Sequence, residues 1–275
     1  MADIYFKSDD LFEDIIRDRL SDKKIISIDR IVTGWTNYVF DVTCSNSSYI
    51  FRFPRDEFWS RALIKEYEFS NYVSNKIDFK ISKLNIYYDK GRPYSVHEKL
   101  KGVVLSKKMD DLTDDEFVLV CSDIAKFMYQ LHGIDYVSNK IFDINNINLD
   151  LASFVKEFLV YHINNNISFE DIDLSSNLDN ILVHGDLNSD NILLDDNNRV
   201  IGVIDFSFGG YGDKYDDIAR IIGRTSPRFK NQIIKCYEDC SKENLDLDFL
   251  NKKIITWKNI DNSYINYMKK AGIFK

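Results

Sequence analysis

The chain has 275 residues, of which 44% are hydrophobic and 14% aromatic, and it carries a net charge of −8. This length and composition predict a globular protein with a large core, arranged as one domain of two lobes or as two domains. The acidic balance argues against nucleic acid and anionic membranes as partners and permits cationic ones. No apolar run approaches the ~20 residues of a membrane span.

The first residues, MADIYFKSDDLFEDII, are acidic and lack the charged and apolar segments of a secretory leader. The four cysteines form no CxxC pair, and the four histidines are dispersed along the chain, which argues against a zinc site. We therefore expect a reduced, cytoplasmic protein. Nothing in the sequence requires more than a monomer.

The N-terminal part combines two helical patterns with several strand patterns. Helical periodicity predicts helices over 9–20 and 57–74. Alternating or apolar runs predict strands, with a hairpin turn at 45–47 and another at 91–93; these strands lie at 24–31, 37–44, 48–54, 83–88 and 94–100. The resulting unit is an antiparallel sheet with one helix over residues 24–98. Lys101-Gly102 then breaks the pattern, so we predict an N-terminal lobe of residues 1–98 and a C-terminal lobe of residues 99–275.

Two features of the N-terminal lobe have the chemistry to hold phosphates. The loop at 33–37, with Gly34, could bring backbone amides near a phosphate, although taken alone this loop favours a plain hairpin turn. Neither a GxGxxG fingerprint nor a P-loop is present. Arg52 on a strand and Glu66 on the following helix could form a pair that positions nucleotide phosphates. The alternative is that both are ordinary surface charges.

The C-terminal lobe is predicted to be mainly helical. Thr113 and Glu116 form a capping box before a helix that ends near His132. Residues 143–180 carry one base and seven acids, which suits either a solvated helical insertion or an acidic wall for a cationic substrate; the acids are Asp143, Asp150, Glu157, Glu170, Asp171, Asp173 and Asp179. Further helices are predicted over 229–240 and 247–270. Residues 213–275 hold nine acids and thirteen Lys or Arg, which counts against this tail alone as the site of a polycation.

Between these parts, residues 183–217 predict a strand, a polar loop, a hairpin and a second strand. The loop carries Asp186 and Asn191, the hairpin turn is at 195–198, and the second strand ends at Asp205. This order brings three oxygen-bearing side chains to one end of a small sheet. Such a group suits a carboxylate that orients a hydroxyl beside a divalent metal held by an amide and a carboxylate.

With these residues the sequence resembles the aminoglycoside phosphotransferase family, whose α+β fold is similar to the bilobal fold of protein kinases. The resemblance covers roughly residues 25–225 and is carried by segments in the family's order: Gly34-Trp35-Thr36-Asn37, Ile50 to Pro54, Glu66, Lys99 to Val103, Ala125 to His132, His184-Gly185-Asp186, Asn191, Ile204-Asp205-Phe206 and Gly212-Asp213 to Ala219. The HGD…N…D spacing is the most specific of these. The strand and hinge segments look most like the 2''-acting branch, and GDKYDDIA looks as much like the 3'-acting branch.

The resemblance implies a role for each matching position. Asp186 would orient or deprotonate a substrate hydroxyl, and Asn191 and Asp205 would hold Mg²⁺. ATP or GTP would be the phosphate donor. The remaining implied roles are phosphate binding by Gly34, Thr36, Arg52 and Glu66, backbone contacts to the purine by Glu98 and Leu100, support of the catalytic loop by His184 and Asp217, and contacts to a cationic substrate by Asp150, Glu157 and Asp213.

Two positions depart from the kinase pattern. Arg52 stands where the strand often carries Lys, which keeps the charge but presents it as a planar fork. Ser207 follows Asp205-Phe206 where protein kinases place Gly. With HGD in place of HRD and no identifiable activation segment, this favours a small-molecule kinase over a protein kinase.

Three functions are therefore in competition. The first is phosphorylation of an aminoglycoside hydroxyl, which would confer antibiotic resistance. The second is a kinase of the same fold acting on choline, homoserine, methylthioribose or a macrolide. The third is a nucleotide-binding module without catalysis, which is disfavoured because Asp186, Asn191 and Asp205 are all present.

Overall fold

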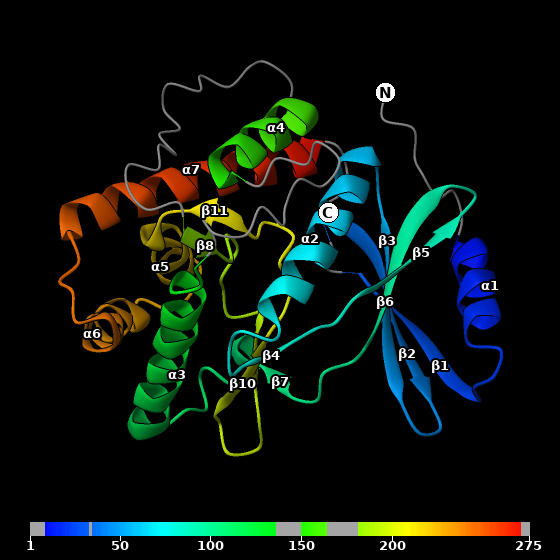
Figure 1. The fold of residues 1–275 in the computed structure, drawn as a ribbon, viewed down its shortest axis with the longest axis horizontal. Helices are drawn as coiled ribbons and strands as arrows, with labels where there is room; N and C mark the ends of the chain where they lie inside the picture. Colours follow the sequence, from blue (N-terminus) through cyan, green and yellow to red (C-terminus); the bar gives the residue numbers. More distant parts are fainter. Residues whose placement is uncertain (1–8, 33–34, 136–149, 164–180, 271–275) are drawn as a thin grey trace.

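The computed structural model describes residues 9–32, 35–135, 150–163 and 181–270, and these form two lobes (Figure 1). The N-terminal lobe is a twisted antiparallel sheet with a helix on each side of it. The C-terminal lobe is built from α3 to α7 and short strands. This bilobal α+β arrangement is the predicted one.

The N-terminal sheet has five strands in the order β1-β2-β3-β6-β5. Their bounds are β1 Ile25–Ile31, β2 Asn37–Cys44, β3 Ser48–Pro54, β5 Asn85–Asp89 and β6 Arg92–Glu98. Helix α1 (Asp9–Arg19) packs on one face, where Phe12 contacts the rings of Phe40 and Phe53 at centroid distances of 5.3 and 4.7 Å. Burying aromatic side chains of this size contributes on the order of 2 kcal/mol each.

Helix α2 (Glu57–Val73) carries the second half of the predicted phosphate pair. It begins where the Asp56 side chain accepts a hydrogen bond from the Trp59 amide at 3.0 Å, a typical N-cap. Its buried face includes Phe58, Ala62 and Phe69, and Glu66 lies on the same face. The helix therefore holds a buried carboxylate against the strand that carries Arg52.

Within the described residues the C-terminal lobe contains five α-helices and the short 3-10 helix η1 (Leu105–Lys107). The five α-helices are α3 Asp114–His132, α4 Leu151–Ile163, α5 Lys214–Gly223, α6 Phe229–Ser241 and α7 Leu247–Lys270. The capping box of Thr113 and Glu116 is confirmed, with the Thr113 amide donating to the Glu116 carboxylate at 2.9 Å. No helix among the described residues is long and apolar enough to cross a membrane.

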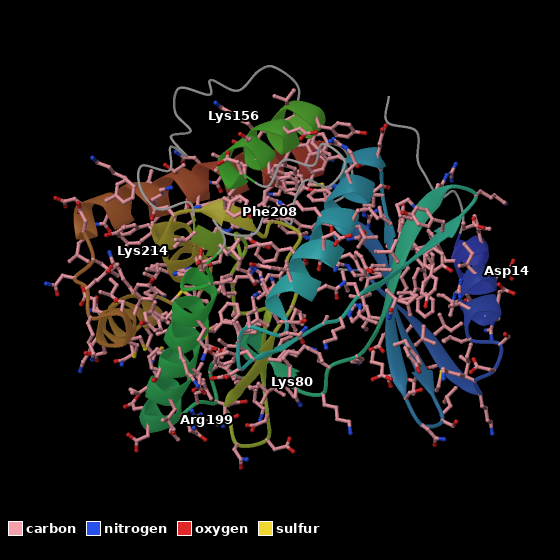
Figure 2. All side chains as sticks on the ribbon, viewed as in Figure 1. Asp14, Lys80, Lys156, Arg199, Phe208 and Lys214 are labelled. Carbon is pink, nitrogen blue, oxygen red and sulfur yellow. The ribbon has the colours of Figure 1, made fainter. Side chains whose placement is uncertain are left out.

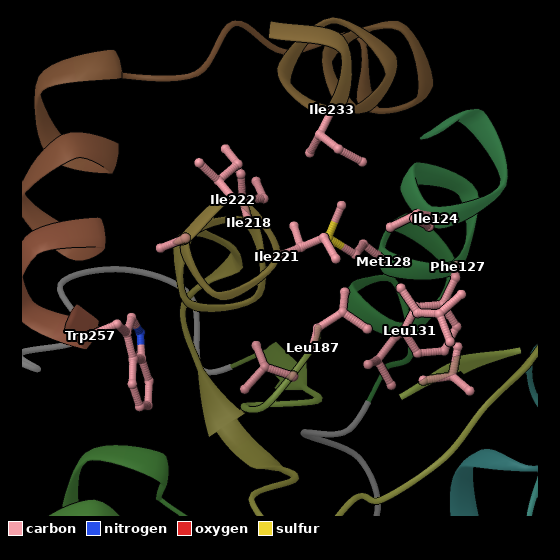
Figure 3. Close-up of a cluster of buried hydrophobic side chains, with 14 of the residues drawn as sticks. Ile124, Phe127, Met128, Leu131, Leu187, Ile218, Ile221, Ile222, Ile233 and Trp257 are labelled. Atoms are coloured by element: carbon pink, nitrogen blue, oxygen red, sulfur yellow. The ribbon is translucent and has the colours of Figure 1, made fainter. Parts of the chain in front are cut away.

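Helices α3, α5 and α6 pack around one apolar cluster, shown in Figure 3. Ile218, Ile221 and Ile222 of α5 face Met128 of α3 and Ile233 of α6, and all five are buried. Leu187, from the polar loop that follows β8, also lies in this cluster and is fully buried. The loop that carries Asp186 is thus anchored in the core by its next residue.

The short strands of the C-terminal lobe form two small sheets. One has the order β4-β10-β9-β7 and the other pairs β11 with β8. Their bounds are β4 Lys80–Ile81, β7 Val103–Val104, β8 Ile181–Val183, β9 Ile192–Leu194, β10 Val200–Val203 and β11 Gly210–Gly212. Strand β4 belongs to the predicted N-terminal lobe but pairs in parallel with β10. A boundary at residue 98 therefore encloses the whole five-stranded sheet. The exception is β4, which precedes the boundary in sequence but pairs with a strand of the C-terminal lobe.

Candidate active site

The loop between β8 and β9 places Asp186 on the wall of a cavity of about 880 Å³ between the lobes. Asn191 and Asp205 line the same cavity, as do Arg52 and Thr36 from the N-terminal lobe. The three oxygen-bearing side chains predicted from spacing are therefore brought together. Gly34 lies outside the described residues.

The backbone at Asp186 is fixed by a glycine and by a buried carboxylate. Gly185 has φ of +74°, and a Cβ there would lie 2.6 Å from the Phe208 carbonyl oxygen. The Asp217 carboxylate accepts hydrogen bonds from the amides of His184 and Gly185 at 2.9 and 2.8 Å. Asp217 on α5 thus holds the loop through two hydrogen bonds to backbone amides. This placement agrees with the predicted supporting role.

His184 supports the loop from the other side. Its Nδ1 accepts a hydrogen bond from the Asp186 amide at 3.2 Å, and its Nε2 lies 3.0 Å from the Ile204 carbonyl oxygen. These two partners require the neutral tautomer with the proton on Nε2. The imidazole links the Asp186 loop to the end of the strand that precedes Asp205.

His132 is a supporting residue that the sequence did not reveal. Its Nε2 lies 3.1 Å from the Asp217 carboxylate, and its Nδ1 lies 2.8 Å from the Tyr237 hydroxyl. Burial alone would raise the pKa of Asp217, but the hydrogen bond and charge of His132 and the other partners hold the pKa below its usual range. The final residue of α3 therefore orients the carboxylate that holds the loop of Asp186.

Arg52 and Glu66 form the predicted pair, with Nη1 of Arg52 donating to Glu66 at 2.7 Å. Nη2 of Arg52 lies 3.4 Å from Asp205, and the Phe206 amide donates to the same Glu66 oxygen at 3.2 Å. Both members of the pair are buried. Burial lowers the pKa of Arg52, but the charges of Glu66 and Asp205 outweigh it and raise the pKa. A permanent cation therefore stands beside Asp205.

Asn191 and Asp205 are suited to a divalent metal. Asn191 donates its side-chain N–H to the Asp186 carbonyl oxygen at 2.9 Å. This hydrogen bond fixes the orientation of the amide and leaves its oxygen available as a ligand for a cation. Asp205 has φ of +64°, an uncommon conformation for a residue other than glycine, and its side chain is 37% exposed. One amide oxygen and one carboxylate match the oxygen ligands of Mg²⁺, which also keeps water and phosphate ligands.

Two arginines that the sequence did not reveal, Arg220 of α5 and Arg224 directly after its end, contact Asp186. Arg220 and Arg224 both donate to its Oδ1, Arg224 at 2.9 Å. Burial alone would raise the pKa of Asp186, but the charges of Arg220 and Arg224 outweigh it and hold the pKa below its usual range. Arg220 lies in the last turn of α5 and Arg224 caps its C-terminal end, four residues later, so helical spacing from Asp217 was the available signal.

Both arginines also pair with Asp261 of α7. Arg220 donates to one oxygen of Asp261 at 2.8 Å, and Arg224 donates to the other at 2.9 Å. Arg220, Arg224, Asp186 and Asp261 form a cluster of four charged residues, which we call the arginine–aspartate cluster. It has no net charge when all four are ionised. Its members all line the cavity.

Some predicted residues lie away from the cavity. Asp213 is fully buried and caps α5, where its carboxylate accepts from the Tyr215 amide at 2.9 Å. Glu157 pairs with Arg61, and Asp150 accepts from the Ser153 amide at the start of α4 at 2.7 Å. None of the three acids lines the cavity. Helix caps and an ion pair already engage these carboxylates, and their contact with a substrate stays a prediction.

Glu98 and Leu100 lie at the link between the lobes. They line a second cavity, of about 820 Å³, and are absent from the residues around Asp186. Their contact with a purine stays a prediction. The other acids of 143–180 lie outside the described residues: Asp143, Glu170, Asp171, Asp173 and Asp179.

The family and the fold follow from comparisons with known proteins. A model of the phosphotransferase enzyme family matches residues 27–239. The structure resembles the GDP complex of aminoglycoside 2'-phosphotransferase-IIIa (TM-score 0.70, 18% identity, 96% of this chain and 93% of that chain). It also resembles the ternary complex of APH(2'')-IIa with streptomycin and ATP (TM-score 0.67, 19% identity, 94% and 91%).

A third similar structure is the macrolide 2'-phosphotransferase MphH from Brachybacterium faecium (TM-score 0.62, 13% identity, 94% of this chain and 93% of that chain). At these identities the three likenesses establish the bilobal kinase-like fold. The family match covers well over half of the 275 residues and includes every residue that positions Asp186 except Asp261. The chain therefore belongs to the phosphotransferase enzyme family.

Proposed function

We propose that this protein transfers the γ-phosphoryl group of a nucleoside triphosphate to a hydroxyl of a small molecule. In this reaction the hydroxyl oxygen bonds to the γ-phosphorus, the bond between that phosphorus and the β,γ-bridging oxygen breaks, and the nucleoside diphosphate leaves. The observation that carries the proposal is the meeting of Asp186, Asn191 and Asp205 around one cavity that Arg52, beside Asp205, also lines. A binding module without catalysis has no need of all three.

Asp186 is the residue that we assign to the acceptor hydroxyl. Its lowered pKa keeps it ionised at neutral pH, so it accepts a hydrogen bond from the hydroxyl and takes the proton as the oxygen bonds to phosphorus. Positioning and electrostatic stabilisation then supply most of the rate, because phosphoryl transfer requires little covalent chemistry from the protein.

Arg52, Asn191 and Asp205 serve the donor. Arg52 faces the phosphates as a cation held in place by Glu66. Asn191 and Asp205 would hold Mg²⁺, which supplies charge neutralisation for the nucleotide phosphates when bound. Thr36, at the cavity edge of the N-terminal lobe, is a further candidate for a phosphate contact.

Aminoglycosides are the first acceptor class to test. The sequence resemblance supports them, and similar structures are complexes with kanamycin, streptomycin or gentamicin. Against them stand the positions of Asp150, Glu157 and Asp213, which leave the cavity without these three carboxylates. A second acceptor class, less charged small alcohols such as macrolides, is favoured by the aromatic side chains that line the cavity near Asp186.

The experiment that tests the proposed function is a phosphate-transfer screen of the purified protein with Mg²⁺ and either ATP or GTP. The acceptors are aminoglycosides, macrolides, choline and homoserine, and the readout is phosphorylated acceptor by mass spectrometry. We expect transfer to at least one class and a loss of several orders of magnitude in Asp186→Asn, with nucleotide binding retained. Equal activity of Asp186→Asn and the parent would remove Asp186 from this role.

A further inference from the structure

Helix α7 reaches the cavity through Trp257 and Asp261, which are four residues apart and therefore share one face of the helix. Farther along α7, the ring of Tyr264 lies 5.6 Å from that of Trp35 of the N-terminal lobe. We call the part of the cavity wall formed by Asp186, its two arginines, α7 and Trp35 the acceptor side. It joins the proposed acceptor carboxylate to the last helix of the chain.

Arg220 is held on three sides by the acceptor side. It belongs to α5, which begins at Lys214, labelled in Figure 2, and packs against α7. The guanidinium carbon of Arg220 lies 4.5 Å from the centroid of the Trp257 ring. Nη1 donates to Oδ1 of Asp261 at 2.8 Å, and Nη2 donates to Oδ1 of Asp186. The arginine is buried, so these partners take the place of water around its charge.

Arg224 connects the same two carboxylates but is less enclosed. It caps the C-terminal end of α5, and its side chain is 26% exposed. Its Nη1 donates to Oδ1 of Asp186 and its Nε donates to Oδ2 of Asp261, both at 2.9 Å. An arginine side chain with access to water has several rotatable bonds and keeps one orientation only where its partners fix it. Asp261 is the partner that draws one N–H of each arginine away from Asp186.

The two carboxylate oxygens of Asp186 have different surroundings. Oδ1 accepts from both arginines. Within the part of the chain that the structure describes, no hydrogen-bond donor reaches Oδ2, and the Asp186 side chain is 17% exposed and lines the cavity. Oδ2 is therefore the oxygen with room for an acceptor hydroxyl. An arginine N–H that turned to Oδ2 would compete with that hydroxyl for the same lone pairs.

We propose that Asp261 is a positioning residue of the proposed phosphotransfer and acts on Asp186 through Arg220 and Arg224. Asp261 takes one N–H from each arginine and balances the second positive charge of the pair, so Oδ2 of Asp186 stays available to the hydroxyl. Without this carboxylate, two cations would face Asp186 alone and their freed N–H groups would turn to it. The inference rests on the proposed function and adds one residue to its machinery.

The substitution Asp261→Asn tests this role, because it keeps the size of the side chain and removes its charge. The assay contains Mg²⁺, ATP or GTP, and whichever of kanamycin, erythromycin, choline and homoserine the protein phosphorylates fastest. We expect kcat to fall about thirtyfold or more while both KM values change less than about threefold. A rise in the KM of the acceptor with kcat unchanged would make Asp261 a substrate contact and overturn the inference.

Asp114→Asn is the matched control. Asp114 also pairs with an arginine, Arg228, but does not line the cavity. Its loss should leave kcat and both KM values within about twofold of the parent values, because no contact of Asp186 changes. Far-UV circular dichroism at the assay temperature checks that every variant is folded.

Charge balance distinguishes positioning from damage to the fold. The double variant Asp261→Asn/Arg224→Gln removes one anion and one cation, so Arg220 alone faces Asp186. It should recover kcat by at least about fivefold relative to Asp261→Asn. Structural damage predicts the opposite, since a second substitution would then lower kcat further, and that result would contradict the inference.

The link between Asp261 and Asp186 also has a readout that needs no phosphate transfer. Thermal unfolding is measured for Asp186→Asn, Asp261→Asn and the variant with both substitutions. Removal of both carboxylates leaves the two arginines without an anion, so the loss in Tm should exceed the sum of the single losses by about 2 °C or more. Asp114→Asn combined with Asp261→Asn is the control pair, and its losses should add.

These measurements separate the inference from the reaction. Additive losses in Tm for Asp186→Asn and Asp261→Asn would overturn the inference whether or not transfer is observed. Non-additive losses, without transfer by the parent to any acceptor of the screen, would support the link between Asp261 and Asp186 and remove the proposed reaction.

Discussion

The Nε2 atom of His132 lies 3.1 Å from the Asp217 carboxylate, which in turn accepts the amides of the loop that carries Asp186. The position of Asp186, the proposed catalytic carboxylate, therefore depends on the last residue of α3, which does not line the cavity. Because the histidine and the carboxylate are both buried, neither partner has water as a substitute when the other is removed.

His132→Phe should therefore cost about 1–3 kcal/mol in the free energy of unfolding and lower the turnover number. Urea denaturation and steady-state kinetics measure the two effects. Tyr237→Phe is the control, since it removes the hydroxyl on the other ring nitrogen of His132 and leaves the contact with Asp217. A variant His132→Phe with unchanged turnover would show that the two backbone amides alone suffice to orient Asp217.

Asn191 and Asp205 predict a specific response to magnesium. Asn191→Ala and Asp205→Ala should raise the Mg²⁺ concentration needed for half-maximal transfer by about tenfold or more, because each removes one protein ligand. Asp190→Ala is a suitable control, as it removes a carboxylate one residue away whose partner is Ser106. Identical magnesium titrations for all three variants and the parent would argue against the two assigned ligands.

The parts of this site that the sequence predicted are those that depend on local order along the chain. Asp186, Asn191 and Asp205 lie within twenty residues of each other, so a strand, a loop and a hairpin suffice to bring them together. The sheet of the N-terminal lobe followed from alternation and from short turns. Strand β4 was missed because two residues are too few for a periodic signal.

The acceptor side was predicted less well, for a physical reason. Its residues come from segments as far apart as Trp35 and Tyr264, and only the tertiary fold shows that these rings touch. The sequence shows where the acidic residues are, but it does not show which residues they contact in the fold. Glu157 meets Arg61 of α2, and Asp213 caps its own helix, so counting charges overstated the carboxylates available to a substrate.

Gly185 and Gly91 allow backbone strain to be distinguished from steric overlap when a glycine is replaced by alanine. Both have positive φ, +74° and +80°, but a Cβ at Gly185 would lie 2.6 Å from the Phe208 carbonyl oxygen, whereas a Cβ at Gly91 would meet nothing within 4 Å. Gly91→Ala should cost only the backbone strain, about 1–2 kcal/mol. Gly185→Ala should cost more and abolish phosphate transfer, because the loop must shift at Asp186. Equal changes in melting temperature for the two variants would show that the loop accommodates the methyl group.

Lys65 provides a test of how burial and a ring contact compete. Its ammonium lies 3.5 Å from the centroid of Phe154, it is 1% exposed, and its Nζ has no hydrogen-bond partner. A contact between a cation and a ring contributes about 0.5–2 kcal/mol, and leaving a buried polar group without a hydrogen bond costs about 1–3 kcal/mol. Burial lowers the pKa of Lys65 to about 7, although the charges of Glu66 and Glu157 oppose it. The cost of burial is therefore expected to be the larger effect.

The lowered pKa sets the direction of the pH dependence. Between about pH 7 and the ordinary lysine pKa of 10.5, the unfolded chain binds more protons at this lysine than the folded protein does, so this residue makes stability rise with pH over that range. Lys65→Met should stabilise the protein at pH 7 by on the order of 1 kcal/mol, and its advantage should shrink towards pH 10. Thermal unfolding at both pH values measures this. Lys126→Met, at a side chain that is 52% exposed, is the control and should show no such convergence. A Lys65→Met variant less stable than the parent at pH 7 would mean that the ring contact outweighs burial.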